Sequence, residues 1–416
     1  MRQASEGYPS ADHGPTGGII REALKYTERM SLPRRTFLAT SGAAAAGFCL
    51  SLAGCSKRSS TLPAASSWRD AVAKIEERLP VLMSELKVPG AAIAAIKEAR
   101  VVWIKNCGVS SADTGAPVNS GTLFEAQSMS KPVFAYRVMK LQEQGVLNLD
   151  VPLTRYTPYV FVKNDPRLEL VTARRVLSHT TGLPNWRSKE EPLRFEFTPG
   201  ERWKYSGEGY HYLQSVVSRL TGHVNTGMCE TFEEGYRVCA TDFGEYMAVN
   251  VLRPFDMTSS TYLWSETVSK HKATAHDQNG RPVARAHNTP TNVARYGAAG
   301  SLLTTAADYA KFLIEVMAPK PPDDYRLKAA SLTEMLRPQV DVPGPVKMSW
   351  GLGWQIWHID KGTLIAHGGD DTGFHSESMF SPLTRSGFVM LTNGDNGAGL
   401  IMERLLTDLI NLCFAN

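Results

Sequence analysis

Apolar positions in the first part of the chain change from helical to strand spacing. Residues 68–87 carry apolar side chains three and four positions apart, which predicts an amphipathic helix. Residues 89–109 are rich in apolar and β-branched side chains around a turn-like Lys-Glu-Ala-Arg segment, which predicts two strands. Another apolar-rich run, residues 132–145, predicts a second helix.

The rest of the chain passes from mixed segments back to strands. Between residues 146 and 294, short helical patterns alternate with loops that contain Pro and Gly, which predicts a mostly helical insertion. Four strand-like runs follow, at residues 352–360, 363–369, 376–382 and 387–395. An amphipathic helix from about Gly397 closes the chain.

This order of elements predicts an α/β (α+β) fold. Short consecutive strands with tight turns favour an antiparallel sheet, with helices from both ends of the chain covering its faces. Residues 67–145 and 295–416 would form this α/β sub-domain, and residues 146–294 the inserted helical sub-domain. A cleft is expected where the two parts meet, because small-molecule sites tend to lie at such boundaries.

Charge argues against a nucleic-acid partner. The 416-residue chain has a formal net charge of +4, with 45 basic and 41 acidic residues. Residues 1–60 hold eight Lys or Arg against four acids, so the remaining residues carry 37 of each sign and no net charge. A neutral body without a basic stripe is not typical of nucleic-acid binding.

The N-terminal region is typical of an export signal. Residues 30–55 have a positive start with Arg34 and Arg35, an apolar middle and a small-residue end, which resembles a twin-arginine signal. The closing Leu-Ala-Gly-Cys resembles a lipobox, so we expect an exported, periplasmic or cell-envelope lipoprotein anchored to the membrane through acylated Cys55. An uncleaved transmembrane anchor is the alternative. Residues 1–29 show no pattern of a targeting signal and are interpreted as a possible upstream extension. Residues 56–66 are interpreted as a linker.

Four cysteines remain for the mature protein. Cys229 and Cys239 flank a polar segment and could form a disulfide in an exported protein. Cys107 and Cys413 lie in apolar runs and are predicted to be buried and inert. No cysteine or histidine pair has metal-ligand spacing, so the sequence predicts no metal site.

A serine followed three residues later by lysine occurs in three places. These are Ser84/Lys87, Ser128/Lys131 and Ser269/Lys272. Only Ser128 follows a strand-like segment and opens a predicted helix, where positions three apart share one face. Burial and the positive helix end would lower the pKa of Lys131, so that its amine could accept the serine proton. The Ser128 amide could also stabilise an oxyanion. The alternative is a serine N-cap followed by a surface lysine.

Two further segments carry candidate chemistry. Tyr205 precedes a predicted helix, and its phenol could pass a proton to a leaving group. His367, Gly368 and Gly369 end a predicted strand, where glycines let a substrate approach the strand edge. A core tyrosine and a structural histidine are the alternatives.

Together, these motifs resemble the serine β-lactamase and penicillin-binding superfamily, in particular its class C β-lactamase, D,D-carboxypeptidase and family VIII carboxylesterase branch. The resemblance runs from about Trp68 to Leu412. Besides Ser-Met-Ser-Lys, it rests on residues 174–184, 197–210, 252–262, 298–312, 350–354 and 367–374. It implies that Ser128 is acylated, that Lys131 is its base and that Tyr205 carries protons.

The resemblance also implies a substrate-binding strand at residues 367–369 and a second oxyanion N–H from Asp370, with no metal or organic cofactor. Two departures bear on the substrate. Gly207 stands where the family has the asparagine of Y-x-N, and His367 and Gly368 replace the lysine and threonine of K-T-G. Loss of these partners disfavours β-lactams. We therefore expect hydrolysis of small esters or of D-amino-acid amide or peptide bonds. β-Lactamase activity and a penicillin-binding sensor or scaffold without turnover are the alternatives.

Overall fold

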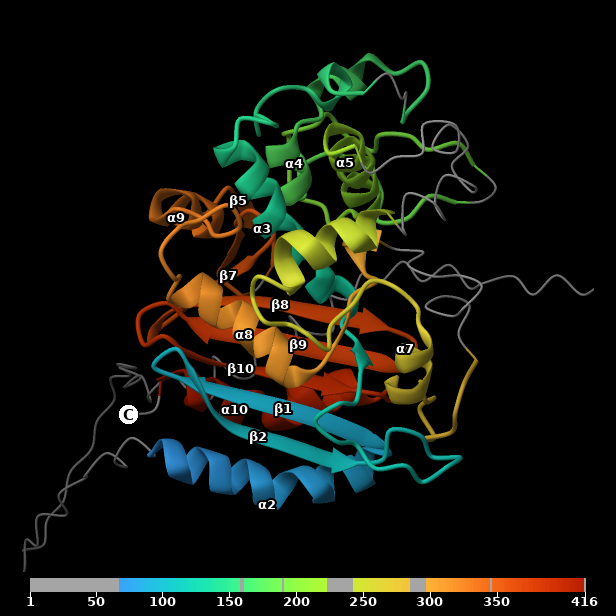
Figure 1. Ribbon diagram of the computed structural model, residues 1–416, viewed down its shortest axis with the longest axis vertical. Helices are drawn as coiled ribbons and strands as arrows, with labels where there is room; N and C mark the ends of the chain where they lie inside the picture. The colour runs from blue at the N-terminus through green and yellow to red at the C-terminus, as the bar shows by residue number, and fades with distance from the viewer. Residues whose placement is uncertain are drawn as a thin grey trace, which may run out of the picture.

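One large antiparallel sheet organises the molecule (Figure 1). The computed structural model describes residues 67–157, 161–188, 191–222, 242–284, 297–344 and 346–414. Eight strands follow the order β2-β1-β10-β9-β8-β7-β6-β5, and all neighbours are antiparallel. Their bounds are β1 Gly90–Lys97, β2 Arg100–Gly108, β5 Val340–Val342, β6 Met348–Trp350, β7 Gln355–Ile359, β8 Gly362–Asp371, β9 Phe374–Ser381 and β10 Ser386–Thr392.

Helices from distant parts of the chain cover the two faces of this sheet (Figure 1). Helices α2 (Trp68–Leu86) and α10 (Leu406–Phe414) pack together on one face, and α8 (Ala306–Met317) crosses the other. The start of α2 is fixed by a capping box, in which Ser67 and Asp70 bond to each other's backbone N–H. The sequence therefore predicted the antiparallel sheet and its terminal helices correctly, but both of these helices lie on one face, and α8, which covers the other, was not predicted.

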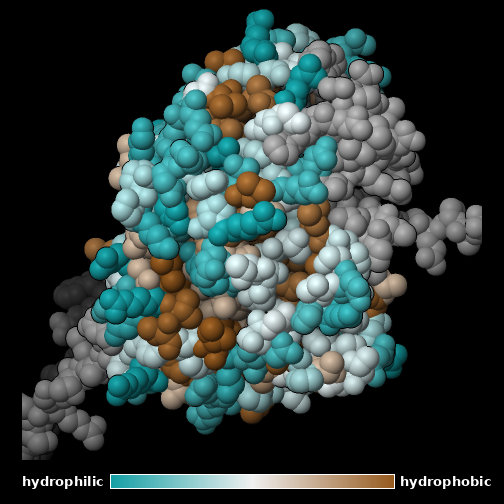
Figure 2. All heavy atoms as spheres, in the orientation of Figure 1, coloured by the Kyte–Doolittle hydropathy of each residue, from teal (hydrophilic) through white to brown (hydrophobic). Residues whose placement is uncertain are grey.

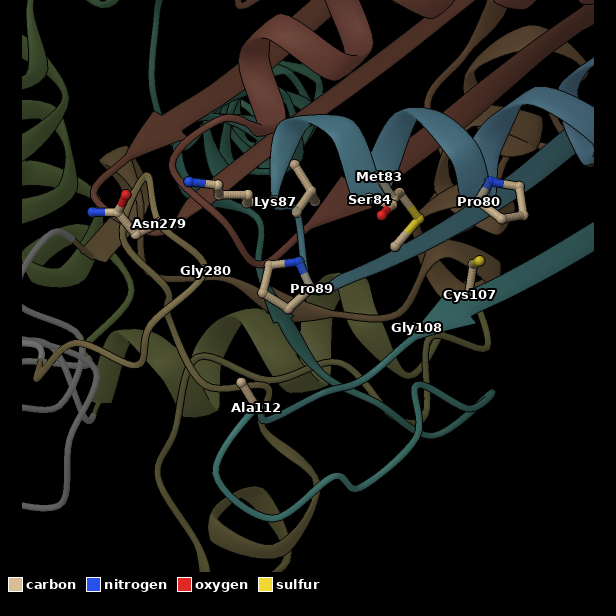
Figure 3. Close-up of a pocket in the computed structure, with 11 residues that line it drawn as sticks. Pro80, Met83, Ser84, Lys87, Pro89, Cys107, Gly108, Ala112, Asn279 and Gly280 are labelled. Atoms are coloured by element: carbon tan, nitrogen blue, oxygen red, sulfur yellow. The ribbon is translucent and has the colours of Figure 1, made fainter.

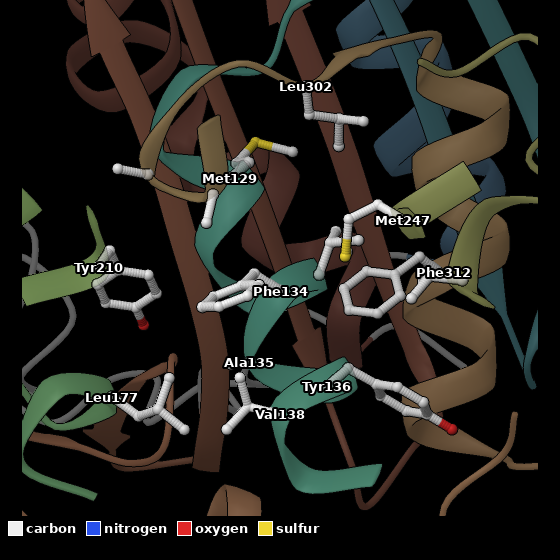
Figure 4. Close-up of a cluster of buried hydrophobic side chains, with 14 of the residues drawn as sticks. Met129, Phe134, Ala135, Tyr136, Val138, Leu177, Tyr210, Met247, Leu302 and Phe312 are labelled. Carbon is white, nitrogen blue, oxygen red and sulfur yellow. The ribbon is translucent and has the colours of Figure 1, made fainter. Parts of the chain in front are cut away.

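The other helices range from single turns to the 14 residues of α3 and α5. They are η1 Gln127–Met129, α3 Ser130–Glu143, η2 Leu153–Arg155, η3 Pro166–Leu170, α4 Ala173–Leu177, α5 Gly207–Leu220, η4 Ala248–Leu252, α7 Glu266–His271, η5 Gly297–Ala299, α9 Ala329–Leu336 and η6 Gly399–Leu405. Strands β3 (Phe124–Glu125) and β4 (Leu303–Thr304) form a separate pair. Helix α3 is buried along most of its length, and Figure 4 shows Phe134, Tyr136 and Val138 within the hydrophobic cluster around it.

The structure differs from the sequence predictions in a few places. Cys107 is half-buried rather than buried, because it lies in β2, the edge strand of the sheet, which has a neighbouring strand on one side only. Cys413 is buried, as predicted. The predicted closing helix begins with a π-helical turn, η6. Residues 1–66 and the Cys229–Cys239 segment lie outside the described residues. Within the described part, no helix is long and apolar enough to cross a membrane.

The surface is mixed in character. Hydrophilic side chains prevail on the face shown in Figure 2, and hydrophobic ones gather in small patches. A hollow of about 420 Å³ lies where α2 ends, and Figure 3 shows Met83, Lys87 and Cys107 among its lining residues. Ser84 also lines this hollow, but none of the lining residues is a tyrosine or a histidine. This second Ser-x-x-Lys pair therefore lacks the partners that surround Ser128.

Candidate active site

Ser128 lies in a tight turn between strand β3 and helix α3. Gln127, just before it, has a φ of 50°, in the left-handed region that residues with side chains rarely adopt. The Ser130 hydroxyl holds this turn, because it donates to Gln127 O at 2.6 Å and accepts from Leu302 N at 3.0 Å. The N-cap of α3 is Met129, which makes no side-chain cap. The structure therefore excludes the alternative in which Ser128 serves as the N-cap.

Lys131 is buried beside Ser128, in the first turn of α3. Its Nζ lies 3.1 Å from Ser128 Oγ and donates to Ala299 O at 2.7 Å. No surface of the residue is exposed, and this burial lowers the pKa of the amine well below its usual value of 10.5. An uncharged amine at this distance can accept the proton of the serine hydroxyl. The alternative of a surface lysine is therefore wrong.

The Tyr205 ring approaches the same amine. Lys131 Nζ lies 4.7 Å from the centroid of this ring. The phenol oxygen is buried and makes no hydrogen bond within the described residues. Burial raises the pKa of the phenol, the nearby Ser128 hydroxyl acts against this rise, and the Asp370 carboxylate adds to it. The phenol therefore keeps its proton at neutral pH and can donate it locally.

His179 packs against Tyr205 and belongs to the site, although the sequence analysis did not single it out. Its ring centroid lies 4.2 Å from that of Tyr205 and 4.8 Å from that of Trp350. Its Nδ1 accepts a hydrogen bond from Ser206 N at 3.1 Å, so the ring proton resides on Nε2. Burial, with a contribution from the nearby Lys131, lowers the pKa of His179 well below its usual value. His179 is therefore neutral and fixes the Tyr205 ring by packing.

His367 is also neutral and buried. Burial and the neighbouring Lys131 lower its pKa to about 3, and 1% of the residue is exposed. Its Nδ1 lies 2.7 Å from Gly368 O, which places the ring proton on Nδ1. Its ring lies 5.6 Å from Trp350 and 6.4 Å from Tyr205, between centroids. Unlike the lysine expected from the family motif, His367 supplies no positive charge at neutral pH.

Strand β8 presents an open edge next to the serine turn. Its pairing with β7 ends at Ala366, opposite Gln355, while its pairing with β9 continues to Asp371. A side chain at Gly369 would place its Cβ 2.2 Å from Ala126 O, so only glycine allows the strand to come this close to the turn. A substrate can therefore lie along this edge and bond to free backbone groups.

Asp370 lies at the end of this edge. It pairs with His375 across the strands, with 2.8 Å between Oδ1 and Nδ1, and 42% of its side chain is exposed. Its carboxylate thus adds negative charge next to the open edge.

Gly368 faces the opposite side of β8 from Gly369, because side chains alternate along a strand. A Cβ at this position would lie 2.8 Å from Glu377 Oε2. Glu377 is buried, accepts a hydrogen bond from Ser378 N at 3.1 Å, and has its pKa raised by burial to about 8. The space for the family's threonine side chain is therefore occupied by an uncharged carboxyl group.

A buried ion pair contacts the turn that carries Ser128, through Gln127. Glu125 pairs with Lys272 at 2.8 Å and accepts from Gln127 Nε2 at 2.6 Å. Its side chain has no exposed surface. The sequence analysis missed this pair, since Lys272 was considered only as part of a third Ser-x-x-Lys pattern. The serine of that pattern, Ser269, is exposed.

The structure brings together most of the residues predicted from the sequence. Ser128, Lys131, Tyr205 and His367 meet at one place, and Gly369 borders the serine turn. Gly207 begins α5, two residues after Tyr205. Across the described residues, no group of three or more His, Cys, Asp or Glu side chains is arranged to hold a metal ion.

Known proteins match most of the chain. A family model described as Beta-lactamase matches residues 72–410. Protein flp of Staphylococcus aureus (strain N315) is 21% identical over 351 residues, which are 78% of this chain and 64% of that protein, so the chain spans less than two thirds of this relative. Penicillin-binding protein 4 of Amycolatopsis lactamdurans is 26% identical over 343 residues, 77% of this chain and 84% of that protein. The solved D-alanine carboxypeptidase AmpC of Burkholderia cenocepacia covers 83% of this chain and 98% of its own, with a TM-score of 0.66 and 21% identity.

Proposed function

Because the chain belongs to the beta-lactamase family, we propose that it is a serine hydrolase that forms an acyl-enzyme on Ser128. The resemblance drawn from the sequence motifs is thus confirmed for the family and the fold. The observation that carries the proposal is the fully buried Lys131 amine, 3.1 Å from Ser128 Oγ. Such an amine loses its proton readily and can then act as a base.

The reaction begins when the neutral Lys131 amine accepts the Ser128 proton while Oγ attacks the carbonyl carbon. The N–H groups of Ser128 and Asp370 stabilise the oxyanion. The proton then passes through the Tyr205 phenol to the leaving alcohol or amine, and the carbonyl re-forms as an ester on Ser128. Water, which loses a proton through the same groups, attacks this ester and releases the acid and the serine.

The substrates that fit this site are small esters or D-amino-acid amide or peptide bonds. A carboxylate on the substrate would gain no cation from His367, whose pKa is about 3. It would also meet the exposed Asp370 carboxylate at the end of the strand edge. β-Lactams carry such a carboxylate, so β-lactamase activity is the weaker candidate. A peptide cleaved at its C-terminal residue carries one too, so the site favours esters and amides without a free carboxylate.

Ester hydrolysis tests the role of Ser128. We expect turnover of p-nitrophenyl acetate that disappears in Ser128→Ala. Ser84→Ala is the matched control, because Ser84 begins the same Ser-x-x-Lys pattern on the exposed end of α2. Equal rates in Ser128→Ala and the wild type would remove Ser128 from the mechanism.

Labelling with a fluorescent penicillin separates the remaining activities. Ester turnover without labelling supports the esterase or peptidase. Labelling with slow release and no ester turnover would instead identify the penicillin-binding sensor, which the relationship to Penicillin-binding protein 4 makes the second candidate. Hydrolysis of a chromogenic cephalosporin would identify a β-lactamase.

We also propose that the protein is an exported lipoprotein, acylated on Cys55 within the motif at residues 52–55. Incorporation of labelled palmitate should be lost in Cys55→Ser and kept in Cys49→Ser, which changes a cysteine inside the apolar part of the signal. Incorporation that persists in Cys55→Ser would contradict this assignment.

A further inference from the structure

The indole of Trp186 fills the space beside Gly207. A Cβ added at Gly207 would lie 2.6 and 2.7 Å from two carbons of this ring. No side chain therefore fits there unless both the indole and the Asn185 carbonyl, whose oxygen would lie 2.8 Å from the same Cβ, move. The ring also lies 5.2 Å from that of His211, between centroids. Nevertheless, 40% of Trp186 is exposed, which is unusual for so large an apolar side chain.

The indole lies close to the chain segment that carries Tyr205 of the candidate active site. Ser206 is extended, with φ −142° and ψ 114°, and its two chain neighbours link the indole to the candidate site. One neighbour is Tyr205, whose ring lies 4.7 Å from Lys131 Nζ. The other is Gly207, and the space on its Cβ side holds the Trp186 ring. The half-exposed indole thus packs against the backbone two residues after Tyr205.

Hydrogen bonds on both sides fix Trp186 to the first turn of α5. On one side, Asn185 O accepts from the backbone N–H of Gly207 and of Glu208, both at 3.0 Å. The Asn185 side chain adds a bond, since its Oδ1 accepts from Gly207 N at 3.0 Å. On the other side, Arg187 donates to the buried Glu208 carboxylate through its backbone N–H at 3.0 Å and its guanidinium at 3.0 and 2.6 Å. A ring held in this way loses little conformational entropy when a ligand packs against it.

We propose that Trp186 forms an apolar wall of the substrate cleft and selects esters that carry a hydrophobic chain or ring. The inference rests on the proposed hydrolysis at Ser128 and names its substrate class. A polar side chain at residue 207 would present hydrogen-bonding groups to the substrate, whereas glycine admits an indole face that offers mainly dispersion and apolar contact. Gly207 is therefore part of the specificity device, because it provides the room for the ring.

Two series of esters test the wall. In the acyl series, kcat/KM is compared for p-nitrophenyl hexanoate and acetate. In the alcohol series, benzyl and ethyl acetate are compared by titration of the released acid. We expect the wild type to prefer the apolar substrate in at least one series, and Trp186→Ala to lower that preference about tenfold, as for lost contact in an apolar pocket. Trp186→Phe should retain most of it, and Gly207→Ala, which displaces the ring, should lower it.

Tyr325→Ala is the matched control, because Tyr325 is an exposed aromatic residue of similar exposure, 37%, outside the site. It should keep the preference of the wild type. An unchanged preference in Trp186→Ala, or no preference for apolar esters in the wild type, would contradict the role of Trp186 as an apolar wall. Ser128-dependent turnover would still support the proposed function in that case. Absence of Ser128-dependent turnover of esters would overturn this role of Trp186, and absence of turnover of D-amino-acid amides as well would also reject the proposed function.

Discussion

Replacing Glu377 by glutamine should stabilise the protein in mildly alkaline solution and flatten the pH dependence of its unfolding. The carboxyl group is buried behind Gly368, where burial raises its pKa from 4.5 to about 8. In the unfolded chain it ionises at its ordinary value, so the folded protein binds this proton more tightly. The resulting stability is complete below pH 4.5 and is lost as pH rises through about 8.

The size of the effect follows from the two pKa values. A rise from 4.5 to about 8 corresponds to about 5 kcal/mol in the free energy of unfolding once the group is fully ionised in both states. Roughly 3 kcal/mol of this is lost between about pH 5 and about pH 8. Glutamine has nearly the same shape and can still accept the bond from Ser378 N, but it stays uncharged.

Urea unfolding of the wild type and of Glu377→Gln, measured at several pH values, gives the difference directly. We expect the variant to gain stability relative to the wild type by about 3 kcal/mol as the pH increases over this range. Glu77→Gln changes an exposed carboxylate on α2 and should show no comparable trend. If Glu377→Gln and the wild type lose stability in parallel, Glu377 is not a buried neutral acid and the reasoning fails.

Three further predictions concern the serine turn and its base. The kcat/KM for p-nitrophenyl acetate should rise with pH as Lys131 loses its proton, with a midpoint well below the usual 10.5; a midpoint near that value would contradict the effect of burial. Tyr205→Phe should lower kcat about a hundredfold with an unchanged melting temperature by circular dichroism, and an equal kcat would exclude the phenol from proton transfer. Glu125→Gln should cost about 3 kcal/mol in urea unfolding, because Lys272 loses its buried partner. A second change, Lys272→Met, should recover part of that loss, and a cost near zero for Glu125→Gln would show that the pair does not support the turn.

The sequence pattern predicted those helices and strands that are long enough to show it. Helix α2 has a clear helical period, strands β1 and β8 contain continuous apolar runs, and the predicted positions of all three agree with the structure. Strands β5 and β6 have three residues each, which is too short for a period to be recognised, and the sequence analysis missed them. The half-buried state of Cys107 was also missed, since sequence spacing does not reveal that β2 is an edge strand.

The candidate site was predicted unevenly for the same reason. Ser128 and Lys131 are neighbours within one turn, so their pairing can be derived from spacing. Tyr205 and His367 come from distant segments, and only family motifs connected them to that pair. Glu377 and Trp186 carry no sequence signal of their own: each acquires its role from a glycine that it meets through the fold. The position of Trp186 in a loop, or of Glu377 in a strand, does not show which glycine the side chain will contact.

The order of strands in the large sheet implies that the candidate site is completed late in synthesis. β1 pairs along its length with β10, for example Ile93 with Met390. The β1–β2 hairpin is therefore synthesised long before β10, its other partner in the sheet. Such long-range pairing slows folding. A ribosome delivers Ser128 and Lys131 early, but the open edge of β8 only much later. Nascent or truncated chains should therefore lack a complete candidate site.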